Sequence, residues 1–97
     1  MVKGAIKAPK RRVYMLFHIT QTHTPDDCPV DSGGSSTLYN ADAEGATLKA
    51  MYGAFSEHVI FYIVEADSFK AVNQFLLPGF KSCTCTVTPV GEESIAK

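Results

Sequence analysis

Alternation of apolar and polar side chains over Val13 to Gln21 is the feature that most constrains the fold of this chain. Successive side chains of a β-strand point to opposite faces of the sheet, so the stretch VYMLFHITQ divides into two sets. One set is wholly apolar and should face a core; it comprises Val13, Met15, Phe17 and Ile19. The other is amphipathic and suits a face that meets a partner or lines a cavity; it comprises Tyr14, Leu16, His18 and Thr20.

Three further strands follow. His58 to Glu65 (HVIFYIVE) is rich in β-branched and aromatic residues, which favour strands. Ala46 to Ala54 precedes it across a hairpin turn at 55–57, and Gly53 interrupts that strand. Lys81 to Val90 closes the series, with Cys83, Cys85 and Val87 alternating against a row of hydroxyl side chains. The sequence therefore predicts four strands.

Two helices are expected between the strands. Asp67 or Ser68 should cap a helix that Pro78-Gly79 ends, with one apolar face formed by Phe69, Val72, Phe75 and Leu76. A shorter helix is expected over Ser36 to Glu44, where Ser35 or Ser36 supplies the N-cap and Gly45 ends it. The preceding loop, Thr22 to Ser36, is long enough to suggest a functional or disordered segment.

The order strand, helix, strand, strand, helix, strand is that of two split β-α-β units. It predicts an α+β fold of the ferredoxin-like βαββαβ type, in which helices cover one face of a four-stranded antiparallel sheet. The first strand should lie at the centre, antiparallel to the third and the fourth. The uncovered face should meet its equivalent in a second copy of the chain, which predicts a homodimer.

Composition limits the possible classes of function. The chain has 97 residues, a formal net charge of −1 and 45% hydrophobic residues, as expected for one soluble globular domain at 13–90. Residues 1–12 are expected to form a flexible basic arm, and 91–97 a tail. No apolar run is long enough for a signal peptide or membrane span, so we expect a cytoplasmic protein without a membrane partner.

The strands hold almost no Lys or Arg, which argues against nucleic acid as a partner. Gly33-Gly34 lacks the context of a phosphate loop, so no nucleotide cofactor is expected.

Three stretches carry a resemblance to a known family: YMLFHITQTHTP, VIFYIVEADSFKAVNQFLLP and TCTVTPV. They resemble the dimeric α/β-barrel superfamily, and within it small stand-alone domains akin to the GYD-domain proteins and muconolactone isomerase. The resemblance covers about 13–90. That superfamily includes cofactor-free monooxygenases, isomerases, haem-handling enzymes and non-catalytic modules. The resemblance therefore implies a dimer with a cavity and leaves the chemistry open.

The predicted topology brings the chemically unusual side chains to one edge of the sheet. There the first strand ends near the starts of the third and fourth strands, so all three histidines and all three cysteines can converge. Imidazole and thiolate suit zinc or another transition metal, and we expect the ligands to be His23, Cys28 and His58. Glu57 or Asp26 could add an oxygen ligand.

Simpler interpretations stand beside the metal site. Three cysteines without a secretion signal do not suggest a disulfide framework, and a bond between Cys83 and Cys85 on one strand face would be strained. Both are then small buried apolar residues. A loop histidine such as His23 could also simply cap a turn.

Two catalytic alternatives remain open. Cys28, activated by His23 or His58, could be a nucleophilic or redox thiolate. Alternatively, His18 or His58 could act as a general base in a cavity. Tyrosine hydroxyls would then bind a small aromatic or lactone-like substrate, the candidates being Tyr14, Tyr52 and Tyr62. The leading expectation is a small dimeric protein that binds a ligand or transition metal. The alternative is a cofactor-independent isomerase or monooxygenase that uses a cavity histidine.

Overall fold

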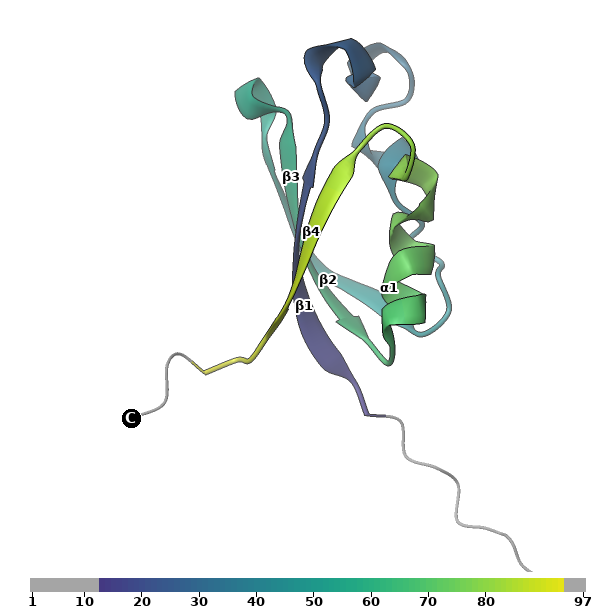
Figure 1. Cartoon of the computed structure of the whole chain (residues 1–97), viewed down its shortest axis with the longest axis vertical. Coiled ribbons are helices and arrows are strands. Elements are labelled where there is room, and N and C mark those ends of the chain that lie inside the picture. Colours follow the sequence, from purple (N-terminus) through teal and green to yellow (C-terminus); the bar gives the residue numbers. More distant parts are fainter. Residues whose placement is uncertain (1–12, 94–97) are drawn as a thin grey trace, which may run out of the picture.

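The computed structural model describes residues 13–93, which form an α+β domain with an open four-stranded antiparallel sheet (Figure 1). The strand order is β2-β3-β1-β4. The strands are β1 (Met15–Thr22), β2 (Ala46–Ala54), β3 (Val59–Ala66) and β4 (Thr84–Val90). The four predicted strands are therefore confirmed, with small shifts at their ends.

Strand β1 lies inside the sheet, as expected, and pairs antiparallel with β3 on one side and β4 on the other. At its end, Thr22 is opposite Val59 of β3 and Thr84 of β4. The end of β1 therefore meets the starts of two other strands. The segment that follows β1 and the turn between β2 and β3 lie at the same end of the sheet, at the top of Figure 1.

The single α-helix of the described chain, α1 (Phe69–Leu76), forms where a cap and an apolar face coincide. The Ser68 hydroxyl accepts a 3.1 Å hydrogen bond from the backbone N–H of Ala71, which satisfies one of the free donors at the helix start. The buried face consists of Ala71, Val72, Phe75 and Leu76. Phe69 is more exposed than its expected core position suggests, although its ring lies 5.4 Å from that of Phe17.

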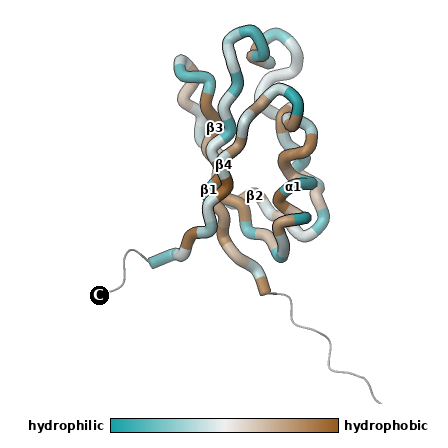
Figure 2. Tube along the Cα trace, viewed as in Figure 1, coloured by the Kyte–Doolittle hydropathy of each residue, from teal (hydrophilic) through white to brown (hydrophobic). Residues whose placement is uncertain are grey.

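The core lies between α1 and one face of the sheet. Tyr62 of β3 is fully buried, and its ring lies 5.4 Å from the rings of both Tyr39 and Phe75. Edge-to-face contacts of this kind stabilise aromatic clusters. Figure 2 shows hydrophobic segments along the central strands and α1, with hydrophilic segments in the turns at the top.

The prediction of a helix over Ser36 to Glu44 is wrong, because the structure has no α-helix there. A short 3-10 turn, η3 (Ser35–Leu38), is followed by further turns. Gly33 and Gly34 both have positive φ, and the Asn40 side chain accepts a hydrogen bond from the backbone N–H of Asp42, which competes with helical pairing. The complete ferredoxin-like βαββαβ pattern is thus met only in part, because this connection holds 3-10 turns in place of the first helix.

The start of the first strand also differs from expectation. Val13 is 74% exposed and Met15 is 49% exposed, although both share the parity of the buried Phe17 and Ile19. Val13 precedes β1 and Met15 begins it, and this end of the strand extends beyond α1, which leaves both side chains partly uncovered (Figure 1). On the same parity, Gln21 is completely buried.

The predicted basic arm, 1–12, and residues 94–97 of the predicted tail lie outside the described residues. Within 13–93, no helix has the length and apolar character needed to span a membrane.

Candidate metal centre

His23 and His58 stand at the point where β1 ends and β3 begins. His23 directly follows β1, and its backbone N–H donates a 3.1 Å hydrogen bond to the carbonyl oxygen of His58. This bond extends the β1–β3 pairing by one step beyond Thr22 and Val59. The sheet itself therefore holds the two histidines side by side.

His58 has an unusual backbone conformation. Its φ is 58° and its ψ is 44°, the left-handed region, and it is the only non-glycine residue with positive φ in 13–93. It ends the 3-10 turn η4 (Phe55–Glu57), and its N–H donates to the carbonyl of Phe55 at 3.3 Å. A non-glycine residue in this region costs on the order of 1–3 kcal/mol, and such residues cluster at functional sites.

The two imidazoles face each other through ring nitrogens. His23 Nε2 and His58 Nδ1 lie 3.3 Å apart, with the rings nearly perpendicular at 75°. This separation fits a hydrogen bond between two neutral rings. It also fits two ligands of one ion, because zinc–nitrogen bonds of about 2.0–2.1 Å in a tetrahedral site place the nitrogens roughly 3.4 Å apart.

Cys28 reaches this pair from the loop after β1. It lies between two 3-10 turns that each begin with proline, η1 (Pro25–Asp27) and η2 (Pro29–Asp31). One donor atom from each of Cys28, His23 and His58 lies within 4.8 Å of the others, and all three residues are half-buried. A zinc–sulfur bond of about 2.3 Å calls for a sulfur–nitrogen separation of roughly 3.6 Å. A side-chain movement of about 1 Å would bring the sulfur and the two nitrogens to the separations that one zinc ion requires.

The electrostatics around His23 favour an uncharged ring. Burial lowers the pKa of His23, the neighbouring His58 lowers it further, and Asp27 acts in the opposite direction. The Nδ1 atom of His23 is also buried, without a hydrogen-bond partner among the described residues. A neutral imidazole is the form that binds metal ions.

A pocket of about 180 Å³ opens beside the three side chains. Its walls are largely apolar and come from the loop after β1, from η4 and from the start of β3; they include Pro29, Val30, Phe55, Val59 and Ile60. Gly34 and Ser35 complete the lining. The cluster is therefore not closed off by protein on every side.

Comparisons with known proteins do not identify this chain. No family model, no curated protein and no solved structure matches it. The resemblance to the dimeric α/β-barrel superfamily accordingly stays a prediction. What can be said of the site depends on its own geometry.

The structure brings together the three predicted metal ligands but not all six histidines and cysteines. His18 lies on the open face of the sheet, opposite Ile63 and Thr88. His23 lies five positions further along the chain, which is roughly 16 Å for an extended segment. The expectation that all three histidines converge is therefore wrong. His18 instead lines a separate hollow of about 390 Å³ with Tyr52, Phe61 and Ile63.

Cys83 and Cys85 lie on the helix-covered face and pack against the core. Burial raises the pKa of both thiols, which disfavours their thiolate forms. This packing supports the simpler interpretation of the pair as small buried apolar residues in part, since both side chains contact the core but are half-buried. The candidate oxygen ligands also fall outside the cluster, since Asp26 and Glu57 are exposed and neither belongs to the three-residue group.

Tyr62 contributes to the lining of the hollow beside His18, but its hydroxyl is not available to a substrate there. Its hydroxyl points into the core, where it donates a 2.7 Å hydrogen bond to the side-chain oxygen of Gln21. Sequence reasoning missed Gln21 as a buried polar residue. The signal was its parity, which places it on the same face as Phe17 and Ile19.

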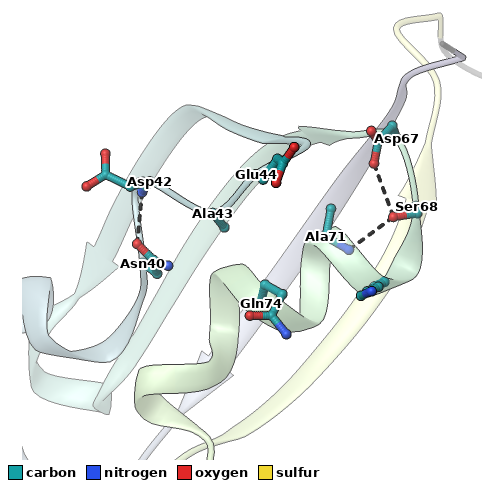
Figure 3. A pocket seen from close by; sticks show the side chains of 9 residues that line it. Asn40, Asp42, Ala43, Glu44, Asp67, Ser68, Ala71 and Gln74 are labelled. Atoms are coloured by element: carbon teal, nitrogen blue, oxygen red, sulfur yellow. Dashed lines mark hydrogen bonds between the residues drawn. The ribbon is translucent and has the colours of Figure 1, made fainter.

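A polar pocket of about 390 Å³ lies at the start of α1 (Figure 3). Three carboxylates and one ammonium group line it, from Asp42, Glu44, Asp67 and Lys70. The Ser68 hydroxyl donates to the Asp67 carboxylate at 3.1 Å and caps the helix, as the dashed lines of Figure 3 show. These contacts account for the local turn and helix start, and we assign no ligand there.

Proposed function

We propose that this protein binds a transition metal ion, with zinc the best fit, through His23, Cys28 and His58. The observation that carries the proposal is the approach of one donor atom from each residue to within 4.8 Å. Two imidazoles and one thiolate form a borderline-soft ligand set that suits zinc, cobalt, nickel or copper better than magnesium or calcium.

The backbone around the site supports this proposal. A hydrogen bond between strands fixes His23 relative to His58, and Cys28 lies between two consecutive proline-initiated turns. Preorganised ligands lose less conformational entropy when the ion binds. An ion held by all three residues would tie the loop after β1 to the β2–β3 turn.

Competition titration with a chromophoric chelator tests the proposal. The full chain, reduced and free of chelator, should bind one Zn²⁺, and Cys28→Ser or His58→Asn should weaken binding by at least tenfold. His18→Asn and Cys83→Ala are matched controls, since neither residue belongs to the cluster. Equal zinc affinity in the parent and in both ligand variants would overturn the proposal.

We further propose that the chain forms a homodimer through the open face of the sheet, as in a dimeric barrel. Apolar side chains on that face support this, namely half-buried Leu16, Phe61 and Ile63 and exposed Tyr52. An isologous contact would bury them in both copies. Light scattering at micromolar concentration should give a dimer mass, which Phe61→Lys should reduce to the monomer. A monomeric parent would contradict the dimer.

A second candidate function is a cofactor-independent isomerase or monooxygenase that uses His18. The hollow lined by His18, Tyr52 and Phe61 is the observation that favours it. Titration with a small phenol, followed by NMR of the histidine rings, distinguishes the candidates. Perturbation of His18 alone supports the cavity enzyme, whereas an unperturbed His18 ring counts against it.

A further inference from the structure

We infer that the metal centre has a fourth coordination position that takes a small anionic ligand, a carboxylate with a short apolar chain. This inference rests on the proposed function, because it concerns the same ion. It adds the class of ligand and the part of the chain that recognises it.

The first argument is the number of protein ligands. Within residues 13–93, the cluster contains three side chains and no further His, Cys, Asp or Glu joins them. Structural zinc sites are almost always closed by four protein ligands, whereas three protein ligands leave a position for water or a substrate. The His₂Cys set is therefore of the open kind.

The second argument is charge. A divalent ion bound by one thiolate and two neutral imidazoles keeps a net charge of about +1. Asp27 acts electrostatically on His23, but it is exposed and accepts a hydrogen bond from the Thr24 hydroxyl at 3.2 Å. Residual positive charge beside largely apolar walls is stabilised by an anionic ligand at the open position.

The third argument is the shape and lining of the pocket. Its volume of about 180 Å³ compares with roughly 30 Å³ for one water in the liquid, so it has room for a ligand of several non-hydrogen atoms. Val30 is 57% exposed and Phe55 is 83% exposed, and they approach the pocket from two separate segments. A short alkyl chain between them would remove apolar surface from water.

The test uses the full chain loaded with Co²⁺, whose visible absorption bands respond to a change of ligand. Titration with straight-chain carboxylates from formate to pentanoate should change these bands. Affinity should rise by about fourfold for each methylene that becomes buried. Phe55→Ser and Val30→Ser should each reduce this dependence on chain length while leaving Co²⁺ affinity unchanged. Phe80→Ser is a matched control, since Phe80 is 74% exposed and lies outside this pocket.

The outcomes distinguish failure of the proposed metal site from failure of the proposed carboxylate ligand. Failure of the chain to bind Co²⁺ would overturn the metal site and the ligand inference with it. Stoichiometric Co²⁺ whose spectrum no carboxylate changes would overturn the ligand inference alone. Equal affinities for formate and pentanoate, or a dependence on chain length that survives in both pocket variants, would also contradict it.

Discussion

The Tyr62 hydroxyl donates a 2.7 Å hydrogen bond to the Oε1 atom of Gln21, and both side chains are completely buried. The amide nitrogen of Gln21 in turn donates to the backbone carbonyl of Leu38 at 3.0 Å. One buried side chain thus joins β3, β1 and the 3-10 turn η3. Because Gln21 lies two residues before His23, this network also anchors the end of β1 that leads into the candidate metal centre.

Removal of the Tyr62 hydroxyl should destabilise the fold. Tyr62→Phe leaves the buried Gln21 oxygen without its donor, which should lower the free energy of unfolding by about 1–3 kcal/mol in urea denaturation. Gln21→Leu should also be destabilising. The double variant should lose less than the sum of the two, because it removes both members of the bond. Additive losses would contradict a coupled pair.

Stability should fall at high pH because of the same tyrosine. Burial raises the pKa of Tyr62 well above its ordinary value of 10.0, with smaller contributions from Tyr39 and the two core cysteines. The unfolded chain therefore loses this proton at a lower pH than the folded chain. The stabilisation is complete below about pH 10 and is lost as pH rises towards the folded pKa. Urea midpoints from pH 8 to 11 should fall more steeply in the parent than in Tyr62→Phe.

The stability of variants at His58 should depend on how readily the new residue adopts a positive φ. Asn adopts the left-handed region more readily than β-branched residues do. His58→Asn should therefore stay within about 1 kcal/mol of the parent without metal, whereas His58→Val should lose on the order of 1–3 kcal/mol. Thermal unfolding of both variants provides the measurement. Equal stability of the Val and Asn variants would show that the strained backbone relaxes there.

The three thiols should react differently with an alkylating reagent. Burial raises the pKa of Cys83 and Cys85, so their thiolate fractions at pH 7.5 are low and alkylation should be slow. Cys28 lies outside the core, and Zn²⁺ should slow its alkylation at least tenfold while leaving the other two rates unchanged. Mass spectrometry of time points measures all three. Uniform protection by zinc would point to a general change of stability rather than to coordination by Cys28.

Much of the fold could be predicted from local patterns. Alternation located β1, the β-branched run located β3, and Ser68 with the apolar face that follows located α1. The strands' pairing also followed from their order. The connection between β1 and β2 could not be predicted correctly, because Gly33, Gly34 and Asn40 favour turns that compete with the weak helical pattern of 36–44.

The three residues of the candidate site could be predicted from the sequence. That His18 and the other two cysteines lie away from it could not. The pairing of β1 with β3 brings His23 beside His58, so topology alone was sufficient for that pair. The positions of His18 and Cys85 depend on which face of the sheet their side chains occupy and on how far along the strand they lie. The burial of Gln21 depended on a partner, Tyr62, that lies 41 residues away in the sequence.

X-ray absorption at the zinc edge is the most direct test of the central claim, that His23, Cys28 and His58 bind one ion. The protein loaded with one equivalent of Zn²⁺ should show one sulfur at about 2.3 Å and two imidazole nitrogens at about 2.0–2.1 Å, with one further light atom. The sulfur should disappear in Cys28→Ser and persist in Cys83→Ala. The assignment would be contradicted if the zinc coordination shell of the parent protein contained no sulfur. It would also be contradicted if the sulfur remained in the shell of Cys28→Ser.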